Sequence, residues 1–249
     1  MPSMPDVIVL CGGAGLRLRS VIGNAPKGMA EVAGRPFLEL LLRQLHRHHF
    51  KRVILAVGHQ SDMIQAHFGE HALGLHLVYS VESSPLGTGG ALRNAADLFG
   101  SDSILVMNGD SYTDVDLTRF LEDHREAMAD ASVVVVPADA RSDCGFVLLD
   151  GNGRLTRFAE KQVPLYASYA NAGIYLLSRA MLDEIPAGVT VSLERELFPQ
   201  WLRQSKVFRA FIYPGACIDI GTPERYRDAQ SALADAEAGI CASQAERHL

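Results

Sequence analysis

The first half of the chain alternates short apolar runs with longer amphipathic stretches, and this alternation most restricts the fold. A run that is apolar at every position fits a strand buried on both faces. The stretches between the runs carry apolar residues at helical spacing, as over residues 36–49, where Leu38, Leu41, Leu42 and Leu45 share one stripe. The expected strands span residues 7–10, 53–57, 75–79, 104–107 and 133–136. Buried strands joined by helices predict a Rossmann-like, doubly wound α/β fold, with a mainly parallel, mixed sheet covered by helices on both faces.

The pattern changes after Pro137. Two apolar runs flank the turn at residues 150–153, which predicts a hairpin over residues 146–158. A further apolar run at 173–177, a helical stretch near 193–202, a run at 207–213 and a last amphipathic helix follow. Because no linker rich in Pro, Gly or Ser and no internal repeat interrupts the 249 residues, we expect one domain with two halves, about 1–137 and about 138–235. Residues 237–249 lack a helical stripe and are expected to fray.

Composition and charge exclude several classes of protein. Hydrophobic residues make up 48% and charged residues 21%, which is globular composition. The 23 basic residues against 29 acidic ones argue against duplex nucleic acid as the main partner. No stretch approaches the roughly 18 apolar residues of a membrane span, and the N-terminus lacks a basic region, so a cytoplasmic protein without a membrane partner is expected. The four cysteines are widely separated and predict neither a disulfide framework nor a zinc site.

The loop after the first predicted strand is the most informative segment. Leu10 and Cys11 are followed by Gly12-Gly13-Ala14-Gly15, where bare backbone N–H groups can approach an anion at the carboxyl end of a strand. The loop lacks the G-x-x-x-x-G-K-[ST] pattern of a P-loop, and Leu18 stands where a dinucleotide fingerprint needs its third glycine. A dinucleotide-dependent oxidoreductase is therefore disfavoured. No helix is expected before Pro26, and a glycine-rich turn without a ligand remains the alternative.

Three cations follow the glycines: Arg17, Arg19 and Lys27. Arginine offers a fork that matches phosphate oxygens, and lysine offers a compact charge that can lie between phosphates. A solvated loop is the alternative explanation for such residues. Together with the glycines, they favour a polyphosphate ligand.

Two acidic residues stand in distinctive surroundings. Asp110 follows the predicted strand at 104–107 within Asn108-Gly109-Asp110, where a carboxylate can hold a divalent cation that bridges phosphates. Asp219 lies between two isoleucines, so its burial requires a metal or a cationic partner. Either residue could instead form a turn, and Thr222-Pro223 after Asp219 predicts a capped helix start.

Three weaker segments complete the set of candidates. Gly87-Thr88-Gly89 lies between a predicted strand and a helix, where bare backbone could hold a base or ribose. Glu160-Lys161 ends the predicted hairpin and offers one acceptor and one cation. Asn171-Ala172-Gly173 precedes another strand and could bind a polyol. Glu194 could reach the same ligand or be solvated.

In this order, the segments resemble the sugar-1-phosphate nucleotidyltransferase family. The resemblance covers about residues 6–230 and rests on Gly12-Gly13-Ala14-Gly15-Leu16-Arg17-Leu18, Pro26-Lys27, Gly34-Arg35-Pro36, Leu86-Gly87-Thr88-Gly89-Gly90, Gly109-Asp110, Glu160-Lys161, Asn171-Ala172-Gly173 and Asp219-Ile220-Gly221-Thr222-Pro223. Within the family the chain looks most like guanylyltransferases that act on D-glycero-α-D-manno-heptose 1-phosphate. It departs from the family at Leu16, where many members carry Thr, and at Gly28, where Pro is frequent.

The resemblance implies a nucleotide-diphospho-sugar transferase type of fold, in which residues 1–137 bind the nucleotide and residues 138–235 bind the sugar. It implies that a sugar 1-phosphate attacks the α-phosphorus of GTP and releases pyrophosphate with Mg²⁺, in the synthesis of surface polysaccharide precursors. The implied catalytic residues are Arg17, Lys27 and Asp110, and the implied Mg²⁺ ligands are Asp110 and Asp219. The implied nucleotide-binding residues are Leu10, Gly12, Gly13, Ala14, Gly15, Gly87, Thr88 and Gly89. The implied sugar-phosphate-binding residues are Asn108, Gly109, Gly145, Glu160, Lys161, Asn171 and Gly173.

Alternatives remain within the family and outside it. The nearest alternative is the same reaction on mannose 1-phosphate with GTP, or on a hexose 1-phosphate with UTP or CTP. A homodimer is compatible with each of these functions. A non-catalytic module that senses nucleotide sugars is disfavoured, because it would not need Arg17, Lys27, Asp110 and Asp219 together. The catalytic hypothesis requires the two acids to meet in space opposite the basic loop.

Overall fold

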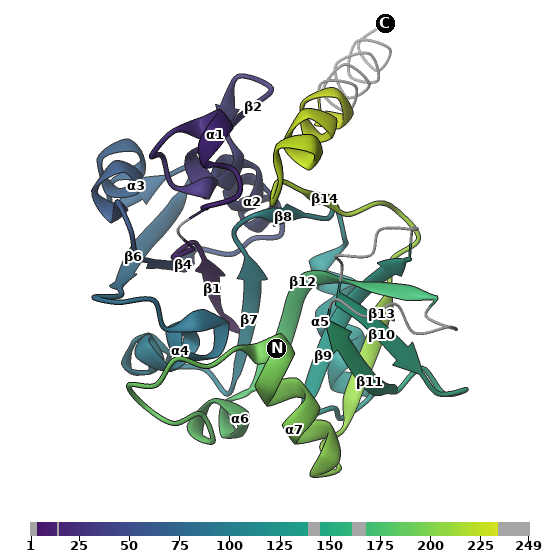
Figure 1. Ribbon diagram of the computed structural model, residues 1–249. Coiled ribbons are helices and arrows are strands. Elements are labelled where there is room, and N and C mark those ends of the chain that lie inside the picture. The colour runs from purple at the N-terminus through teal and green to yellow at the C-terminus, as the bar shows by residue number, and fades with distance from the viewer. Residues whose placement is uncertain (1–3, 14, 139–144, 161–167, 234–249) are drawn as a thin grey trace, which may run out of the picture.

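A mixed sheet forms the centre of the protein. The computed structural model describes residues 4–13, 15–138, 145–160 and 168–233, and ten strands of these residues join in one sheet (Figure 1). Its parallel centre has the order β6-β4-β1-β7. These strands are β1 (Asp6–Leu10), β4 (Arg52–Val57), β6 (Leu75–Val81) and β7 (Ser103–Asn108), with the short β5 (His71–Ala72) at the edge. The runs at 7–10, 53–57, 75–79 and 104–107 thus form parallel strands as predicted, each extended by one or two residues, whereas the run at 133–136 forms β9 (Ala131–Pro137), which pairs antiparallel with β12 (Tyr169–Ser178).

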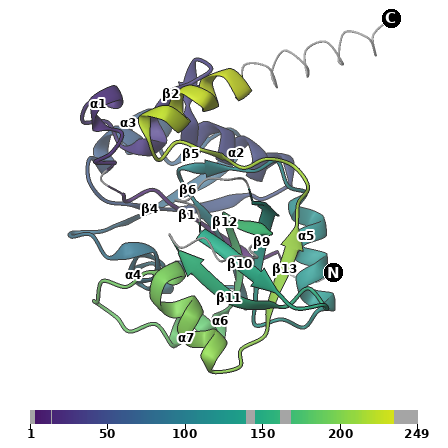
Figure 2. The ribbon, with the colours of Figure 1, turned by 45° about the vertical axis from the view of Figure 1, so that its right-hand side comes forward.

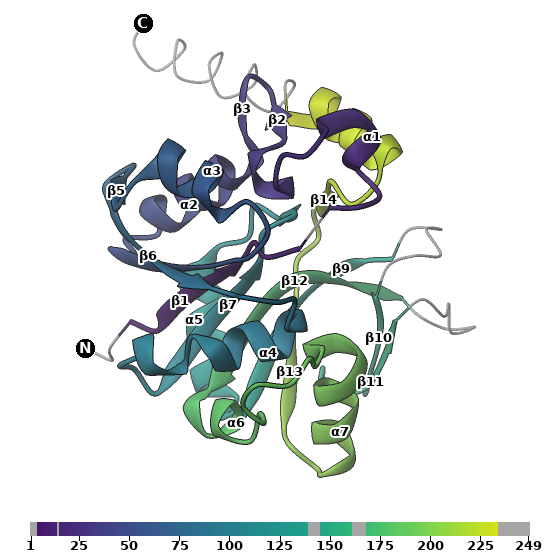
Figure 3. The same ribbon diagram turned by 60° about the vertical axis from the view of Figure 1, so that its left-hand side comes forward.

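Helices cover both faces of the sheet, which confirms the doubly wound prediction. On one face, α2 (Phe37–Arg47), α3 (Ser61–Phe68) and α5 (Leu117–Glu126) share a buried cluster with Val7, Val9 and Leu55. On the other face, α4 (Gly87–Asn94), α6 (Arg179–Asp183) and α7 (Phe198–Arg203) pack with Ile8 and Ile54. Figure 3 shows α2 and α3 on one side of the sheet and α4, α6 and α7 on the other. Successive strand residues point to opposite faces, so each strand needs apolar residues throughout.

The chain changes direction at the centre of the sheet. From β1 it proceeds outward through β4 to β6, and it then returns across α4 and the 3₁₀ turn η2 (Ala96–Leu98) to β7 on the other side of β1. The carboxyl ends of β1 and β7 therefore lie next to each other, with Leu10 opposite Asn108. In an open α/β sheet such a reversal leaves a crevice where ligands bind.

The second half of the chain extends the sheet with antiparallel strands. The predicted hairpin forms as β10 (Gly145–Leu149) and β11 (Leu155–Glu160), and β12 (Tyr169–Ser178) pairs with β7, β9 (Ala131–Pro137) and β10. β13 (Phe208–Ile212) adds to β9 in parallel. The register of β12 against β9 shifts between Asn171 and Tyr175, where Gly173 has a φ of 74°. This irregularity bends β12 beside the end of β7.

A small satellite layer packs around Leu18, which follows the glycine loop. It contains α1 (Arg19–Ile22), the 3₁₀ turn η1 (Lys27–Met29), the ribbon of β2 (Glu31–Val32) and β3 (Arg35–Pro36), and a helix over residues 223–233. The helix lies beside α1 and β2 although it is distant from them in sequence (Figures 1 and 2). Tyr226 Oη and Gln230 Nε2 both donate to the carbonyl oxygen of Glu31. The expectation that no helix precedes Pro26 was wrong, because α1 packs its Ile22 against this layer.

Among the described helices, none is long and apolar enough to cross a bilayer. The tail at 237–249 lies outside the residues that the structure describes.

Candidate active site

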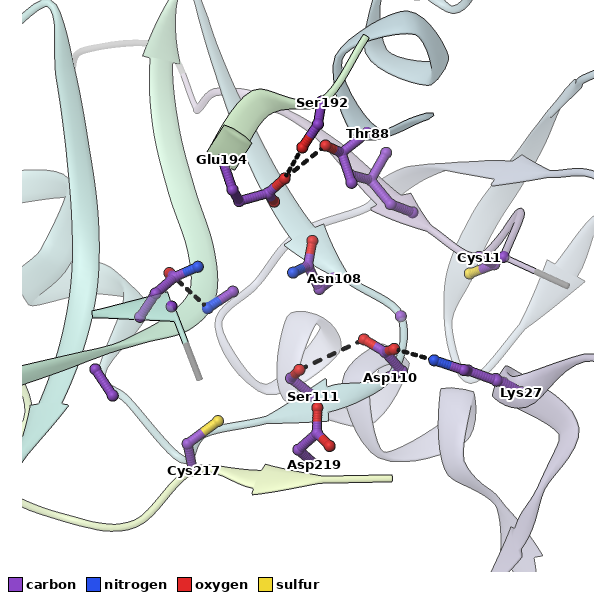
Figure 4. A pocket seen from close by; sticks show the side chains of 18 of the residues that line it. Cys11, Lys27, Thr88, Asn108, Asp110, Ser111, Ser192, Glu194, Cys217 and Asp219 are labelled. Atoms are coloured by element: carbon purple, nitrogen blue, oxygen red, sulfur yellow. Dashed lines mark hydrogen bonds and ion pairs between the residues drawn. The ribbon is translucent and has the colours of Figure 1, made fainter. Parts of the chain in front are cut away.

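A pocket of about 830 Å³ opens at the carboxyl ends of β1 and β7. Its volume is within the usual range for sites that bind small molecules, about 300–1,000 Å³. Residues of both halves of the chain line it, from the glycine loop, the start of α4, the bend of β12, the turn η3 (Leu193–Leu197) and the segment before β14 (Ile218–Asp219). Figure 4 shows Asp110 near the centre of this pocket, with Lys27 on one side and Asn108 above it.

The structure brings most of the predicted site residues together. Those that line the pocket are Leu10, Gly12, Gly13, Lys27, Gly87, Thr88, Asn108, Gly109, Asp110, Gly145, Asn171, Gly173 and Asp219. Three predicted residues lie elsewhere: Gly15 contacts the stem of Lys27 from outside the lining, Gly89 is buried in α4, and the side chain of Arg17 is exposed beyond the pocket. Ala14, Lys161 and the side chain of Glu160 are outside the described residues.

Two glycines permit close approaches in the walls of the pocket. A Cβ at Gly109 would lie 2.7 Å from the carbonyl oxygen of Leu10 and 3.0 Å from Cys11 Sγ, so the ends of β7 and β1 meet only because this side chain is absent. Gly87 has a φ of 73°, and a Cβ there would lie 2.7 Å from the carbonyl oxygen of Val191. These contacts fix the start of α4 and the end of β7 relative to the rest of the pocket.

Backbone pairing brings the two acids into one pocket. Asp110 precedes β8 (Ser111–Tyr112), which pairs antiparallel with β14, so that Asp219 lies opposite Ser111. The backbone N–H of Ile220 donates to the carbonyl oxygen of Asp110 over 3.0 Å. Both acids line the pocket, and Figure 4 shows the Asp219 side chain below Ser111. The two acids of the catalytic hypothesis therefore line one pocket, whereas Arg17 of the basic loop is exposed outside its lining.

Each acid has a cationic partner. Lys27 Nζ lies 2.7 Å from Asp110 Oδ2, and Arg225 Nη1 lies 2.8 Å from Asp219 Oδ1, which also accepts from the backbone N–H of Gly221. The side chain of Arg225 is only 13% exposed. Arg225 comes from the helix that Thr222 caps by accepting from the backbone N–H of Arg225. Each half-buried carboxylate thus has a cation within hydrogen-bond distance, which offsets the cost of its burial.

The donor set fits a magnesium ion. Carboxylate oxygens on two adjacent elements are the hard ligands that Mg²⁺ prefers, and Mg²⁺ usually keeps several waters and substrate phosphates beside one or two carboxylates. No group of three or more potential metal-ligating side chains occurs in the part of the chain that the structure describes. Asp110 and Asp219 therefore suit an ion whose coordination the phosphates complete.

Glu82 forms a half-buried acceptor at the glycine-loop end of the pocket. It follows β6, and its Oε2 accepts from the backbone N–H of Leu86 over 2.9 Å. Its Oε1 lies 2.9 Å from the position of a Cβ on Gly12. Burial raises the pKa of this carboxyl, and the hydrogen bond from Leu86 offsets part of that rise.

A second group of hydrogen-bonded side chains lies at the pocket around Glu194. Glu194 Oε2 accepts from Thr88 Oγ1 over 2.7 Å and from Ser192 Oγ over 2.9 Å (Figure 4). Glu194 Oε1 accepts from the hydroxyl of Tyr175, which in turn accepts from Asn171 Nδ2. Of the two alternatives for Glu194, the structure supports the one in which it faces the pocket.

Cys11, which lines the pocket, does not supply a nucleophile. Burial, with a smaller effect of nearby Asp110, raises the pKa of the Cys11 thiol to about 12, so its thiolate is scarce at neutral pH. Cys217 is half-buried and its thiol lies 3.8 Å from the carbonyl oxygen of Ala172. A reaction by direct displacement between two bound substrates needs no such nucleophile.

Sequence reasoning missed three polar residues of this region: Glu82, Tyr175 and Arg225. Glu82 had a usable signal, because it is an acid placed directly after a buried strand and three residues before Pro85. Tyr175 lies in an apolar run, and Arg225 lies on a helix rich in charged residues, so their partners are visible only in three dimensions.

The doubly wound sheet, the glycine loop at its crevice and the paired acids and cations define the class of nucleotide-binding α/β transferases. Comparison with known proteins agrees: the chain matches the nucleotidyl transferase family over residues 6–236 and belongs to it.

Several relatives and solved structures are similar to the chain. It is 37% identical to a mannose-1-phosphate guanylyltransferase of Mycobacterium tuberculosis, over 97% of this chain and 67% of the relative. It is 33% identical to a D-glycero-α-D-manno-heptose 1-phosphate guanylyltransferase of Aneurinibacillus thermoaerophilus, over 92% of this chain and 98% of the relative. The crystal structure of HddC from Yersinia pseudotuberculosis superimposes with a TM-score of 0.81 and 31% identity, covering 92% of this chain and all of that one, and HddC has also been crystallised with GMP-PN.

Proposed function

We propose that this protein is a guanylyltransferase that condenses GTP with D-glycero-α-D-manno-heptose 1-phosphate to give a GDP-sugar and pyrophosphate. The observation that carries the proposal is the meeting of Asp110, Asp219 and Lys27 in one pocket at the carboxyl ends of β1 and β7. The relatives named for this activity support the choice of substrates, since one of them matches over nearly its whole length.

Glu82 supports the choice of a guanine base. The glycine loop and the start of α4 would hold the nucleotide, and the carboxylate of Glu82 is a pure acceptor beside Gly12. The Watson–Crick edge of guanine carries adjacent N1–H and N2–H donors, which a carboxylate can accept together, whereas uracil offers one N–H on that edge. A carboxylate in this place therefore favours GTP over UTP.

Small residues on the sugar side leave room for a seven-carbon sugar. This side of the pocket lies between the bend of β12, the start of β10 and the segment before β14, and its lining includes Gly145, Ala170, Gly173, Gly215 and Ala216. Asn108 and Asn171 are amides on the same side, suited to sugar hydroxyls. We assign the sugar phosphate to this side, together with Glu160, the last residue of β11, and Lys161, the next residue in the sequence.

The chemistry needs positioning and charge stabilisation. A phosphate oxygen of the sugar 1-phosphate forms a bond to the α-phosphorus of GTP, and the bond from that phosphorus to the β-phosphate oxygen breaks. Lys27 lies in the pocket beside Gly28 and Asp110, where its ammonium group would lower the repulsion between the two anionic substrates. We assign Arg17 to the binding of the leaving pyrophosphate. Its side chain is exposed in this structure, so this role requires the loop that carries it to move toward the pocket.

A bound Mg²⁺ would neutralise phosphate charge beside Asp110 and Asp219. The protein's own contribution is to place both carboxylates in one pocket through the β8–β14 pairing and to orient them through Lys27 and Arg225.

A second candidate function is the same transfer to mannose 1-phosphate. The similarity to the mycobacterial relative favours it, with 37% identity over 97% of this chain. The two candidates share the nucleotide, the metal and the chemistry, and they differ only in what the sugar side accepts.

The test is a pyrophosphate-release screen of four nucleoside triphosphates against a panel of sugar 1-phosphates, with Mg²⁺ and with EDTA. We expect release from GTP with the heptose 1-phosphate, loss of release with EDTA, and a kcat at least 10²-fold lower in Asp110→Ala, which should remain folded. Release with mannose 1-phosphate alone would select the second candidate. Binding of GTP without release from any pair would indicate a sensing module and refute both.

Glu82→Gln tests the choice of base in the same screen. The substitution replaces one acceptor oxygen with an NH₂ group that only donates, so the side chain can no longer accept from guanine N1–H and N2–H through two oxygens. We expect a KM for GTP about tenfold higher and little change in the KM for the sugar 1-phosphate. Glu70→Gln, on the surface outside the pocket, is the matched control. An unchanged KM for GTP in Glu82→Gln would refute the role of this carboxylate.

A further inference from the structure

A chain of hydrogen bonds connects the nucleotide side of the pocket to the sugar side through the protein interior. Thr88 Oγ1 donates to Glu194 Oε2 over 2.7 Å, and the Tyr175 hydroxyl donates to Glu194 Oε1 over 3.0 Å. Asn171 Nδ2 donates to the Tyr175 oxygen over 2.7 Å, and Asn171 Oδ1 accepts from the backbone N–H of Gly173 over 3.0 Å. Thr88, Glu194 and Asn171 line the pocket, whereas Tyr175 lies beneath it with 0% exposure.

The carboxylate of Glu194, which lies between Thr88 and Tyr175, determines the direction of the bonds in this chain. A carboxylate only accepts hydrogen bonds, so the Tyr175 hydroxyl must donate its single hydrogen to Glu194. The phenol oxygen can then only accept, and its partners are the side-chain amides of Asn171 and Asn108. The amide nitrogen of Asn171, and not its amide oxygen, must therefore face Tyr175. The amide oxygen consequently faces the backbone N–H of Gly173, in agreement with the observed 3.0 Å contact. Burial and the nearby Glu194 raise the pKa of Tyr175 well above its usual value, so the phenol keeps its proton.

Local structure holds both ends of the chain in place. Thr88 Oγ1 also accepts from the backbone N–H of Leu193 over 2.8 Å, which ties α4 to η3. The ring of Tyr175 packs edge-on against Phe198, with centroids 5.0 Å apart. Asn171 lies at the start of the irregular segment of β12, whose position depends on Gly173. The hydroxyl of Tyr175 is therefore the link between a fixed carboxylate and an amide that would otherwise be able to flip.

We propose that Tyr175 is a positioning residue for sugar recognition: with Glu194 it locks the side-chain amide of Asn171 in one orientation, and the remaining N–H and lone pair of that amide then meet the hydroxyl groups of the sugar 1-phosphate. The proposal rests on the proposed function, because it assigns the sugar 1-phosphate to the side of Asn171. Tyr175 does not itself touch the substrate, since its side chain is outside the lining of the pocket.

The variant Tyr175→Phe removes only the hydroxyl and keeps the ring against Phe198. We expect the KM for the sugar 1-phosphate to rise about tenfold, equivalent to about 1.4 kcal/mol, while the KM for GTP changes less than twofold. Both D-glycero-α-D-manno-heptose 1-phosphate and α-mannose 1-phosphate are assayed. Tyr79→Phe is the matched control, because Tyr79 donates its hydroxyl hydrogen to a backbone carbonyl, that of Gly69, away from the pocket. Equal increases in both KM values in Tyr175→Phe would indicate general damage and overturn the proposal.

A double-mutant cycle with Asn171→Ala identifies the route of the effect. If Tyr175 acts through Asn171, the double variant Tyr175→Phe/Asn171→Ala binds the sugar 1-phosphate as weakly as Asn171→Ala alone. Effects that add in full would mean that Tyr175 acts by another route, and the proposal would be wrong.

A spectroscopic measurement decides the orientation of the amide without any substrate. In protein labelled with ¹⁵N-asparagine, the side-chain amide signals of Asn171 are identified by their loss in Asn171→Ala. We expect one amide proton to exchange slowly in the wild type and rapidly in Tyr175→Phe, with no change in Tyr79→Phe. Identical exchange in the wild type and Tyr175→Phe would refute the proposal. A wild type that releases no pyrophosphate from any pair, yet shows the protected proton, would instead refute the proposed function.

Discussion

Adding one methyl group at Gly109 should lower both the stability and the activity of the protein, whereas the same change at a matched control position should lower neither. A Cβ on Gly109 would lie 2.7 Å from the carbonyl oxygen of Leu10, 3.0 Å from Cys11 Sγ and 3.3 Å from Cys11 Cα. Contacts below 3.0 Å with backbone are not tolerated, so Gly109→Ala must push the ends of β1 and β7 apart.

The control lies at the other end of the same strand. Gly100 precedes β7, and a Cβ there would meet no atom within 4 Å. Its backbone N–H donates to Asp6 Oδ2, a bond that Gly100→Ala retains. Both substitutions add the same methyl group and restrict the unfolded chain equally, so the difference between the two variants isolates the contacts at Gly109.

Overpacking of this kind costs about 1–3 kcal/mol. For a chain of this length, about 2 kcal/mol corresponds to a Tm lower by about 4–8 °C. The residue after Gly109 is Asp110, and since a displacement of about 1 Å costs about 10²-fold in rate, we expect kcat/KM to fall by about tenfold to 10²-fold. For Gly100→Ala we expect a change within about 0.5 kcal/mol and unchanged kinetics.

Thermal unfolding followed by circular dichroism and the pyrophosphate-release assay measure the two effects. If Gly109→Ala melts within 1 °C of Gly100→Ala and retains its kcat/KM, the close approach of β1 and β7 does not restrain the site as described.

Three further predictions concern single residues. Asp6→Ala removes an acceptor for two backbone N–H groups and the Ser101 hydroxyl at the far end of β1, so urea unfolding should show a loss of about 2–3 kcal/mol with unchanged kcat. Burial lowers the pKa of His124, which hydrogen-bonds Ser132. The stability that the neutral ring contributes is therefore present above pH 6.5 and is lost as the pH falls through the lowered pKa of the folded state. Urea unfolding at pH 5 to 7 should show that the free energy of unfolding falls less with acid in His124→Gln than in the wild type. Because the pKa of Cys11 is about 12, peptide mapping after iodoacetamide treatment at pH 8 should find Cys11 unmodified until the protein is unfolded.

The sequence predicted the sheet well because the relevant signal is local. The run at 104–107 became β7 (Ser103–Asn108), and the runs around the turn at 150–153 became β10 and β11, since buried strands must be apolar throughout and hairpins need a turn between them. Asp110 and Asp219 were also found from local surroundings, an acid after a strand and an acid between isoleucines.

What the sequence could not provide was the direction of side chains and the identity of distant partners. Arg17 follows the glycine loop, yet the loop turns its side chain to solvent, and that turn depends on contacts of α1 with a helix more than 200 residues later. The pairing of Asp219 with Arg225 depends on where β14 ends and the following helix begins. The hydroxyl of Tyr175 is hidden in a run that otherwise predicts only a buried strand.

The pairing of β14 with β8 has a consequence for how the protein is made. A nascent chain that has emerged only as far as residue 215 already contains the whole central sheet, the glycine loop and Asp110, but not the second acid. Since synthesis proceeds from the N-terminus and contacts between distant segments form slowly, the pocket acquires its acid pair only when nearly the last element described here has docked. The chain therefore becomes competent for catalysis only late in its synthesis. A chain that ends before residue 218 should fold its central sheet but lack the second acid of the pocket.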